Sequence, residues 1–147
     1  MAIKVKDLLK EKGSQVWTID VDATIKEALL LMAEKQIGAI PVMEEGHIRG
    51  MFSERDYVNY VAATGLAGTH EPVCKIMAHP VFFVDPEQTC AECMSLITAK
   101  NIRHIPVVEN DELVGMITVG DILHELIQQQ DGLIENLKYF AWKNIIG

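Results

Sequence analysis

The sequence predicts a mixed α/β (α+β) fold made of two similar β-α-β-β-α repeats, and two observations carry this prediction. First, residues 16–61 align with residues 81–126 at a constant offset of 65 without a gap, and 14 of the 46 aligned positions are identical. Second, apolar runs and helix-start signals occur in the same order in both copies. Because a repeat of this length rarely buries its apolar face alone, the two copies are expected to pack pseudo-symmetrically through their sheets. The seam between them is then the natural place for a binding site.

The first two elements of each repeat are expected to be a short strand and a helix. The apolar runs Val16–Ile19 and Val81–Val84 favour strands. A Thr-x-x-Glu sequence follows each run, at Thr24 and at Thr89. This is a capping box, in which the hydroxyl and the carboxylate pair with amide groups that the first helical turn leaves unbonded. Apolar residues then recur at helical spacing, so a helix is expected after each threonine.

The rest of each repeat is expected to be a hairpin and a second helix. The apolar segments read as buried strands that an acidic, polar turn connects in pairs. The expected pairs are Ala39–Met43 with Ile48–Phe52, and His104–Val108 with Leu113–Ile117. The second helices are expected to begin at Glu54 and Val119.

The domain organisation follows the repeats. Residues 1–65 form the first repeat with a lead-in helix, and residues 66–127 form the linker and the second repeat. Residues 128–147 have no counterpart in the first repeat and carry apolar residues at helical spacing, including Leu133, Leu137 and Phe140. An amphipathic C-terminal helix that packs on the body or on a second subunit is therefore expected.

Composition excludes several functional classes. The chain has 147 residues, of which 49% are hydrophobic, which is enough for one core shared by both repeats. No stretch approaches the roughly 18 consecutive apolar residues of a membrane span, and the N-terminus lacks the apolar centre of a signal peptide. A cytoplasmic location without membrane association is expected. The net charge of −8, with 13 Lys and Arg against 21 Asp and Glu, argues against a nucleic-acid partner.

The sequence also gives no sign of catalysis. Cys90 and Cys93 form a C-x-x-C motif that would suit redox or metal chemistry, but the first repeat has the apolar Ile25 and Ala28 at these positions. This favours buried, inert thiols, and no second ligand pair has the spacing of a metal site. Motifs of nucleophilic, metal-dependent or phosphate-loop enzymes do not occur. Neither an enzymatic activity nor a catalytic cofactor is therefore expected.

The residues of greatest interest lie where the last strand of each repeat meets the second helix. Ser53-Glu-Arg-Asp56 and Thr118-Val-Gly-Asp121 both follow a Gly-Met-apolar sequence, and both come 12 residues after the proline of an Ile-Pro-Val strand. As a structural element, S/T-x-x-D caps a helix. As a binding element, it places a hydroxyl and amides where a phosphate is favoured, with a carboxylate that can accept both hydrogen bonds of a ribose diol.

In this combination of motifs the chain resembles a tandem pair of CBS domains, known as a Bateman module, of the small stand-alone bacterial type. The resemblance extends from the lead-in helix to about residue 127. It implies two clefts that bind adenosine-containing ligands such as AMP, ATP, NAD(H) or S-adenosylmethionine. It also implies a homodimer and a regulated protein partner.

The resemblance assigns Asp56 and Asp121 to ribose, and Ser53 and Thr118 to phosphate. Because adenine is often held between the halves in this family, Asp56 is expected to share a cleft with Arg103 and His104. The nucleotide-binding residues of this preferred cleft are then Ser53, Arg55, Asp56, Met77, Phe82, Ile102, Arg103, His104, Ile105 and Pro106.

The second cleft is expected to bind more weakly. It has Gly120 where the first has Arg55, Gly38-Ala39 where the first has Arg103-His104, and the bulky Trp17 where a base would enter. Its residues are Lys12, Trp17, Ile37, Gly38, Ala39, Ile40, Met116, Thr118 and Asp121.

Two functional hypotheses remain. The first is a non-catalytic regulatory sensor whose packing changes when an adenine nucleotide binds. The second is an assembly or scaffold module in which both clefts are vestigial and the S/T-x-x-D turns only cap helices.

Overall fold

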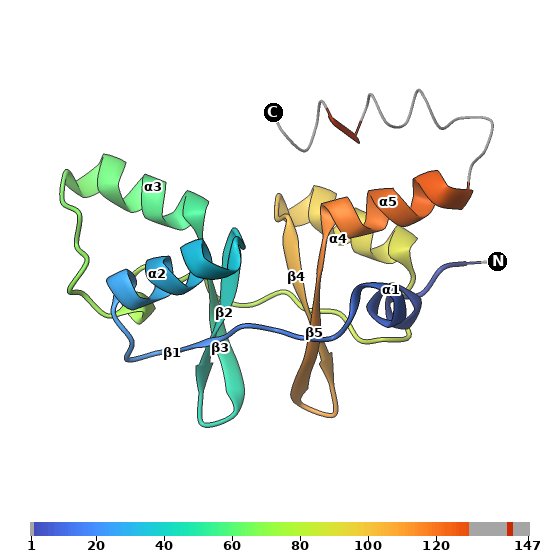
Figure 1. Ribbon diagram of the computed structural model, residues 1–147, viewed down its shortest axis with the longest axis horizontal. Coiled ribbons are helices and arrows are strands. Elements are labelled where there is room, and N and C mark those ends of the chain that lie inside the picture. The colour runs from blue at the N-terminus through green and yellow to red at the C-terminus, as the bar shows by residue number, and fades with distance from the viewer. Residues whose placement is uncertain (1, 130–140, 143–147) are drawn as a thin grey trace. The chain divides into compact units, whose positions relative to one another are not determined.

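The computed structural model describes residues 2–129 and 141–142, and the prediction of a mixed α and β fold is confirmed (Figure 1). The elements are α1 (Val5–Lys12), β1 (Ile19–Asp20), α2 (Ile25–Lys35), β2 (Ala39–Glu44), β3 (His47–Ser53), α3 (Glu54–Thr64), the 3-10 turn η1 (Val73–Lys75), α4 (Cys90–Lys100), β4 (His104–Glu109), β5 (Glu112–Thr118) and α5 (Val119–Gln129). A C-terminal helix was expected at 128–147. Of this range the structure describes only residues 128–129, which end α5, and residues 141–142, so the expected helix lies mostly outside the described residues.

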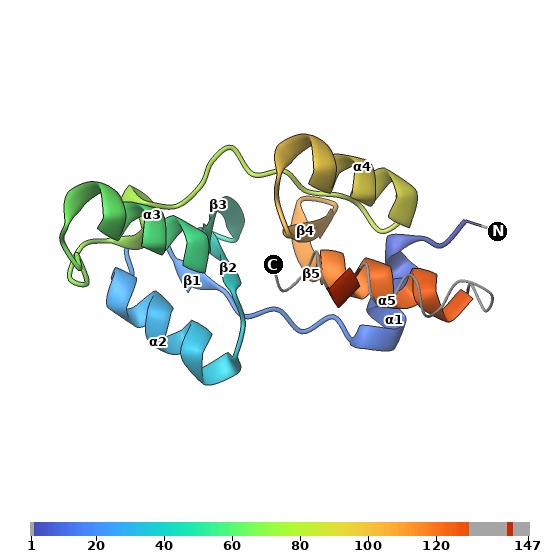
Figure 2. The ribbon, with the colours of Figure 1, turned by 90° about the horizontal axis from the view of Figure 1, so that it is seen from above.

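The chain forms two compact units. The first-repeat unit contains Val16–Phe82 and Asp111–Leu113, and the second-repeat unit contains Met1–Gln15, Phe83–Asn110 and Val114–Gly147. In the first-repeat unit, α2 and α3 lie on the same side of the β1-β2-β3 sheet (Figures 1 and 2). In the second-repeat unit, α1, α4 and α5 lie on one side of the β4-β5 hairpin.

Each unit has its own apolar core. In the first-repeat unit, Ile25 and Met32 of α2 pack with Ile40 of β2 and Phe52 of β3. In the second-repeat unit, the equivalent positions of α4 and the hairpin pack together, and Cys90 and Cys93 belong to this core. The prediction that these two thiols are buried is therefore confirmed, with exposed fractions of 2% and 0%.

The segments that precede the two repeats, α1 and η1, are exchanged between the two units. Helix α1 precedes the first repeat in the sequence, but Val5 and Leu8 are buried in the core of the second-repeat unit. The amide of Cys90 donates a hydrogen bond to the carbonyl of Ile3 over 2.8 Å. In the same way Val73 of η1 packs in the core of the first-repeat unit, where its amide donates to the carbonyl of Ala23. Sequence order alone therefore does not give the packing partners of these segments.

Both predicted threonine caps form, and the reciprocal capping box is complete at Thr89, where the Thr89 amide donates to the Glu92 carboxylate. At Thr24 the Glu27 carboxylate instead accepts from the threonine hydroxyl. The Thr24 and Thr89 side chains accept hydrogen bonds from the amides of Glu27 and Glu92, each over 3.1 Å. These interactions fix where α2 and α4 begin.

The expected first strands are shorter than the apolar runs. In the first repeat only Ile19–Asp20 pairs, in parallel, with β2. In the second repeat the strand expected at Val81–Val84 is reduced to a single parallel bridge between Val84 and Val107. Of that run only Val84 is buried, whereas Phe82 and Phe83 are exposed. Pro86, two residues further on, has no amide hydrogen with which to extend the pairing.

Candidate functional site

The turn from β3 into α3 holds the first of the two predicted Asp residues. Ser53 is the N-cap of α3, and its side chain accepts a hydrogen bond from the amide of Asp56 over 3.2 Å. In return, the Asp56 Oδ2 atom accepts from the Ser53 amide and the Ser53 hydroxyl, both at 2.9 Å. The Asp56 carboxylate is therefore held in one orientation at the positive end of the helix.

The turn from β5 into α5 repeats this arrangement. The Thr118 amide donates to Asp121 Oδ2 over 2.8 Å, and the Asp121 amide donates to the Thr118 hydroxyl oxygen over 3.1 Å. Both Asp side chains are only partly buried. The two repeats thus place a carboxylate and a hydroxyl in the same local geometry.

Each of these turns lies beside the start of its own Ile-Pro-Val strand. Ala39 of β2 pairs with Ser53 of β3, and the Glu54 amide donates to the Gly38 carbonyl over 3.0 Å. In the second-repeat unit the Val119 amide donates to the Arg103 carbonyl over the same distance. The hairpin of each repeat therefore brings the segment before its first strand next to the segment before the second helix.

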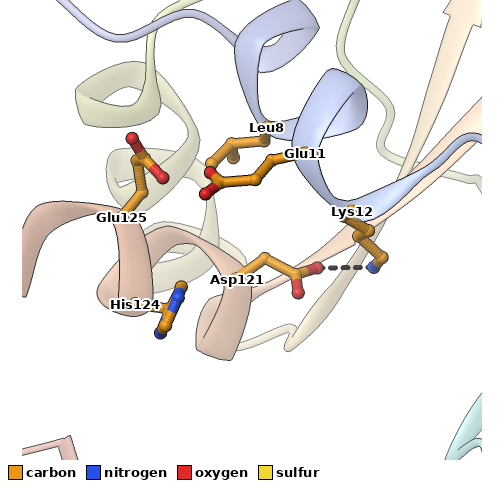
Figure 3. Close-up of a pocket in the computed structure, with 6 residues that line it drawn as sticks. All are labelled: Leu8, Glu11, Lys12, Asp121, His124 and Glu125. Atoms are coloured by element: carbon orange, nitrogen blue, oxygen red, sulfur yellow. Dashed lines mark hydrogen bonds and ion pairs between the residues drawn. The ribbon is translucent and has the colours of Figure 1, made fainter. Parts of the chain in front are cut away.

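A pocket of about 200 Å³ lies next to the second turn, between α1 and α5 (Figure 3). Its lining residues are Leu8, Glu11, Lys12, Asp121, His124 and Glu125. The Lys12 ammonium group forms an ion pair with Asp121 over 2.5 Å, and the Glu11 and Glu125 carboxyl groups both reach into the space between the helices. The pocket is mostly acidic, with one lysine at its edge.

Two titrating groups near this turn have shifted pKa values. The contact with Glu11 raises the pKa of Glu125, because two carboxyl groups that share a hydrogen bond favour one bound proton. Burial lowers the pKa of His104, and the positive charges of Lys12 and Arg103 lower it further, whereas the Asp121 charge acts in the opposite direction. His104 therefore lies within electrostatic reach of Lys12, Arg103 and Asp121.

Comparison with known proteins identifies the repeats. The model of the CBS domain matches residues 5–63 and 73–128. The chain belongs to the CBS domain family. It is a pair of CBS domains, a regulatory type of module, and the resemblance seen in the sequence is confirmed.

Relatives and solved structures agree with this assignment. The CBS domain-containing protein YhcV of Bacillus subtilis is 34% identical over 118 residues, which is 80% of this chain and 81% of that protein. The crystal structure of a CBS-domain containing protein from Agrobacterium tumefaciens has a TM-score of 0.80 and 36% identity, and covers 84% of this chain and 98% of that one.

A third structure shares the fold at lower sequence identity. It is the CBS domain pair of protein MJ0100, in complex with 5-methylthioadenosine and S-adenosyl-L-methionine. Its TM-score is 0.73 at 20% identity, with 88% of this chain and 100% of that chain covered.

Several residues predicted for the clefts have structural roles in their own CBS domain. Ile40, Ile105 and Pro106 are buried, as is Ala39, so contact with a ligand at these positions would use the backbone. Trp17 packs partly on the core of the first domain, and the Lys35 ammonium group lies 4.1 Å from the centre of its ring.

Other residues predicted for the clefts are exposed or partly buried. Arg55, Phe82 and Arg103 are exposed, and Met77 packs against Gly50. Ile37, Ile102, Met116 and His104 are partly buried. Asp56 belongs to the first-repeat unit and Arg103 and His104 to the second-repeat unit, and their grouping in one cleft stays a prediction.

Sequence reasoning missed most of the pocket beside Asp121. Lys12 was predicted for this cleft, but Glu11, His124 and the pairing of Glu11 with Glu125 were not. The signal was present as helical spacing, because residues 8, 11 and 12 share one face of α1, and residues 121, 124 and 125 share one face of α5. What the spacing could not show was that α1 lies on α5.

Within residues 2–129 and 141–142, no helix has the length and apolar character that crossing a bilayer demands.

Proposed function

We propose that this CBS-domain pair is a non-catalytic sensor of adenosine-containing nucleotides such as AMP, ATP or NAD(H). The observation that carries this proposal is the repeated turn, in which Ser53 with Asp56, and Thr118 with Asp121, place an oriented carboxylate at a helix N-terminus. A carboxylate can accept both hydroxyl hydrogens of a ribose diol. The helix N-terminus beside it favours the negative charge of a phosphate.

The Arg103 guanidinium group supports a phosphorylated ligand. Arg103 is exposed and His104 is partly buried beside it, immediately before the Ile105-Pro106 step. A guanidinium group can bind a phosphate through two parallel hydrogen bonds. The solved CBS pair that contains 5-methylthioadenosine and S-adenosyl-L-methionine supports an adenosine moiety, because it shares this fold.

We further propose that the site containing Asp56 binds more tightly than the site containing Asp121. Arg55 adds a cation beside Asp56, whereas Gly120 stands at the equivalent position of the second domain. The ion pair between Lys12 and Asp121 is a second reason, because a ligand at Asp121 has to compete with it.

The experiment is a titration of AMP, ATP, NAD(H) and S-adenosylmethionine by calorimetry and by thermal shift. For a ligand at a hundredfold excess over its dissociation constant, the stabilisation is about 2.7 kcal/mol. Asp56→Ala is expected to weaken binding by roughly tenfold or more, because a charged hydrogen-bond acceptor is lost. Asp121→Ala is expected to affect only the weaker site.

A matched control separates binding from helix capping. Glu92 occupies the same capping-box position in α4 as Asp56 does in α3, and it accepts from the Thr89 amide over 2.9 Å. Glu92→Ala is expected to lower stability as Asp56→Ala does, while nucleotide affinity is retained. If wild type binds none of the four ligands, the sensor function is wrong.

The second candidate function is an assembly module, and exposed apolar side chains favour it. Leu30 of α2 and Val58 of α3 have exposed fractions of 59% and 63% in the first CBS domain. We propose that these helices contribute to a homodimer and to the contact with a regulated partner. Light scattering of Leu30→Asp and Val58→Asp variants tests this, since a lost dimer gives half the mass. Unchanged mass in both variants contradicts this role for the two helices.

A further inference from the structure

Asp121, to which the proposed function assigns a ribose, is already paired with a cation of the same chain. Lys12 Nζ donates a hydrogen bond to Asp121 Oδ2 over 2.5 Å, and the Thr118 amide donates to the same oxygen. The two side chains are 33% and 26% exposed, so the pair is partly sheltered from water. Solvent and salt weaken such a pair less than a fully exposed one. A ribose diol that uses both carboxylate oxygens therefore competes with the lysine for Oδ2.

The first CBS domain has no lysine at the corresponding place. Leu9 contacts Gly115 of β5 in the second-repeat unit, and Met77 contacts Gly50 of β3 in the first-repeat unit, so Leu9 and Met77 are structurally equivalent. Three residues further on, the chain has Lys12 in one case and Pro80 in the other. Proline carries no charge, so this segment supplies no equivalent lysine to Asp56.

Lys12 is close to acidic side chains of the pocket and to the His104 imidazole. Glu11 and Glu125 line the pocket on one side of the ion pair. Lys12 also acts electrostatically on His104, together with Arg103. A phosphate is repelled by the two glutamates and attracted by the Lys12 ammonium group. A ligand that carries a phosphate therefore offers the displaced ammonium group a new anionic partner, whereas an uncharged nucleoside offers none.

We propose that Lys12 is the residue that makes the Asp121 site selective for phosphorylated adenosine over adenosine itself. Without ligand, Lys12 holds the Asp121 carboxylate. When a phosphorylated ligand binds, the ribose takes the carboxylate and Lys12 pairs with the phosphate. Adenosine must break the ion pair without replacing it, and it therefore binds more weakly. This inference rests on the proposed nucleotide-binding function. It explains how one of the two sites distinguishes a phosphorylated ligand from adenosine.

The test compares dissociation constants for AMP and adenosine at the Asp121 site alone. Asp56→Ala provides the parent protein, in which the other site is removed, and Asp56→Asn replaces it if the alanine variant does not fold. Lys12→Gln, Lys12→Arg and Lys10→Gln are made in this parent. Lys10 is an exposed lysine in the same helical turn and serves as the matched control.

The parent is expected to prefer AMP over adenosine, and Lys12→Gln is expected to reduce this preference by about tenfold, the size of one charged hydrogen bond. The adenosine affinity of Lys12→Gln should stay the same or increase, because the competing ammonium group is gone. Lys12→Arg and Lys10→Gln should retain the preference of the parent. A rise in adenosine affinity cannot come from general loss of structure.

Three results would overturn the inference, and they differ in what they say about the proposed function. An unchanged ratio of AMP to adenosine affinity in Lys12→Gln means that Lys12 does not set selectivity, although the site binds nucleotide. Binding in wild type but in neither Asp56 variant means that Asp121 does not form a nucleotide site. Absence of binding by wild type as well means that the proposed function itself is wrong.

Discussion

Met77 packs directly against Gly50, so closely that a side chain at position 50 has no room. A Cβ atom on Gly50 would overlap the Met77 sulfur and would lie 3.0 Å from the Ala78 carbonyl oxygen, which is backbone and cannot rotate away. Because residue 50 is a glycine, the segment that contains Met77 and Ala78 can pass close to strand β3 of the first domain. The amides of Met51 and Ala78 bond to each other's carbonyls at this crossing, over 3.0 and 2.7 Å.

Gly50→Ala is expected to destabilise the protein by about 1–3 kcal/mol, the usual cost of overpacking a tight contact. Urea unfolding followed by circular dichroism measures this change. Gly120→Ala is the control, because a Cβ atom there would meet only the Thr118 hydroxyl oxygen at an ordinary 3.5 Å. Equal stability of Gly50→Ala and wild type would contradict the close contact.

The two cysteines of the C-x-x-C motif are expected to be unreactive in the folded protein. Burial raises the pKa of the Cys93 thiol to about 11, and burial also raises that of Cys90. Little thiolate is therefore present at neutral pH. With a chromogenic disulfide reagent, Cys74, which is partly exposed, should react first, and Cys90 and Cys93 should react only after unfolding. Cys74→Ser should remove the early phase, and a fast phase that persists in this variant would be inconsistent with the buried pair.

The carboxyl groups of Glu11 and Glu125 are expected to make stability decrease as pH rises. The folded-state pKa of Glu125 is raised above its ordinary 4.5, so its contribution is favourable below this value and is lost as pH rises through the folded-state pKa. Above that range Glu125→Gln should melt at a higher temperature than wild type, because the repulsion between two carboxylates is removed.

Thermal melts of Glu125→Gln from pH 4 to pH 8 check this prediction, with Glu112→Gln, an exposed glutamate at the start of β5, as the control. The difference between Glu125→Gln and wild type should grow with pH. A constant difference would show that the two carboxyl groups do not share a proton.

The contribution of His104 to the stability of the protein is expected to depend on pH in the opposite direction. Burial and the charges of Lys12 and Arg103 lower its folded-state pKa below the ordinary 6.5. Its contribution to stability is therefore complete above the ordinary value and is lost as pH falls through the folded-state pKa. His104→Asn should flatten the pH dependence of the melting temperature just below pH 6.5. NMR titration of the imidazole checks the direction directly, and a pKa above 6.5 would contradict the assignment.

Most of the local structure could be predicted from the sequence because its signals are short-range. The Thr24 and Thr89 N-caps, the Ser53–Asp56 and Thr118–Asp121 turns and the β-hairpins depend on residues a few positions apart. The first strands could not be predicted in length, because pairing at Val84 stops where its neighbours turn to solvent, and an apolar run alone does not show this.

The sequence by itself determined that the chain is a duplicated α and β protein with an Asp at the start of each second helix. It could do so because the repeat can be read by aligning the chain with itself, and capping is local. Only the tertiary structure decided that α1 packs with the second CBS domain and that Lys12 meets Asp121. Lys12 and Asp121 are 109 residues apart in the sequence. No periodicity or motif encodes which helix faces lie together, since that choice depends on how whole segments bury their apolar sides.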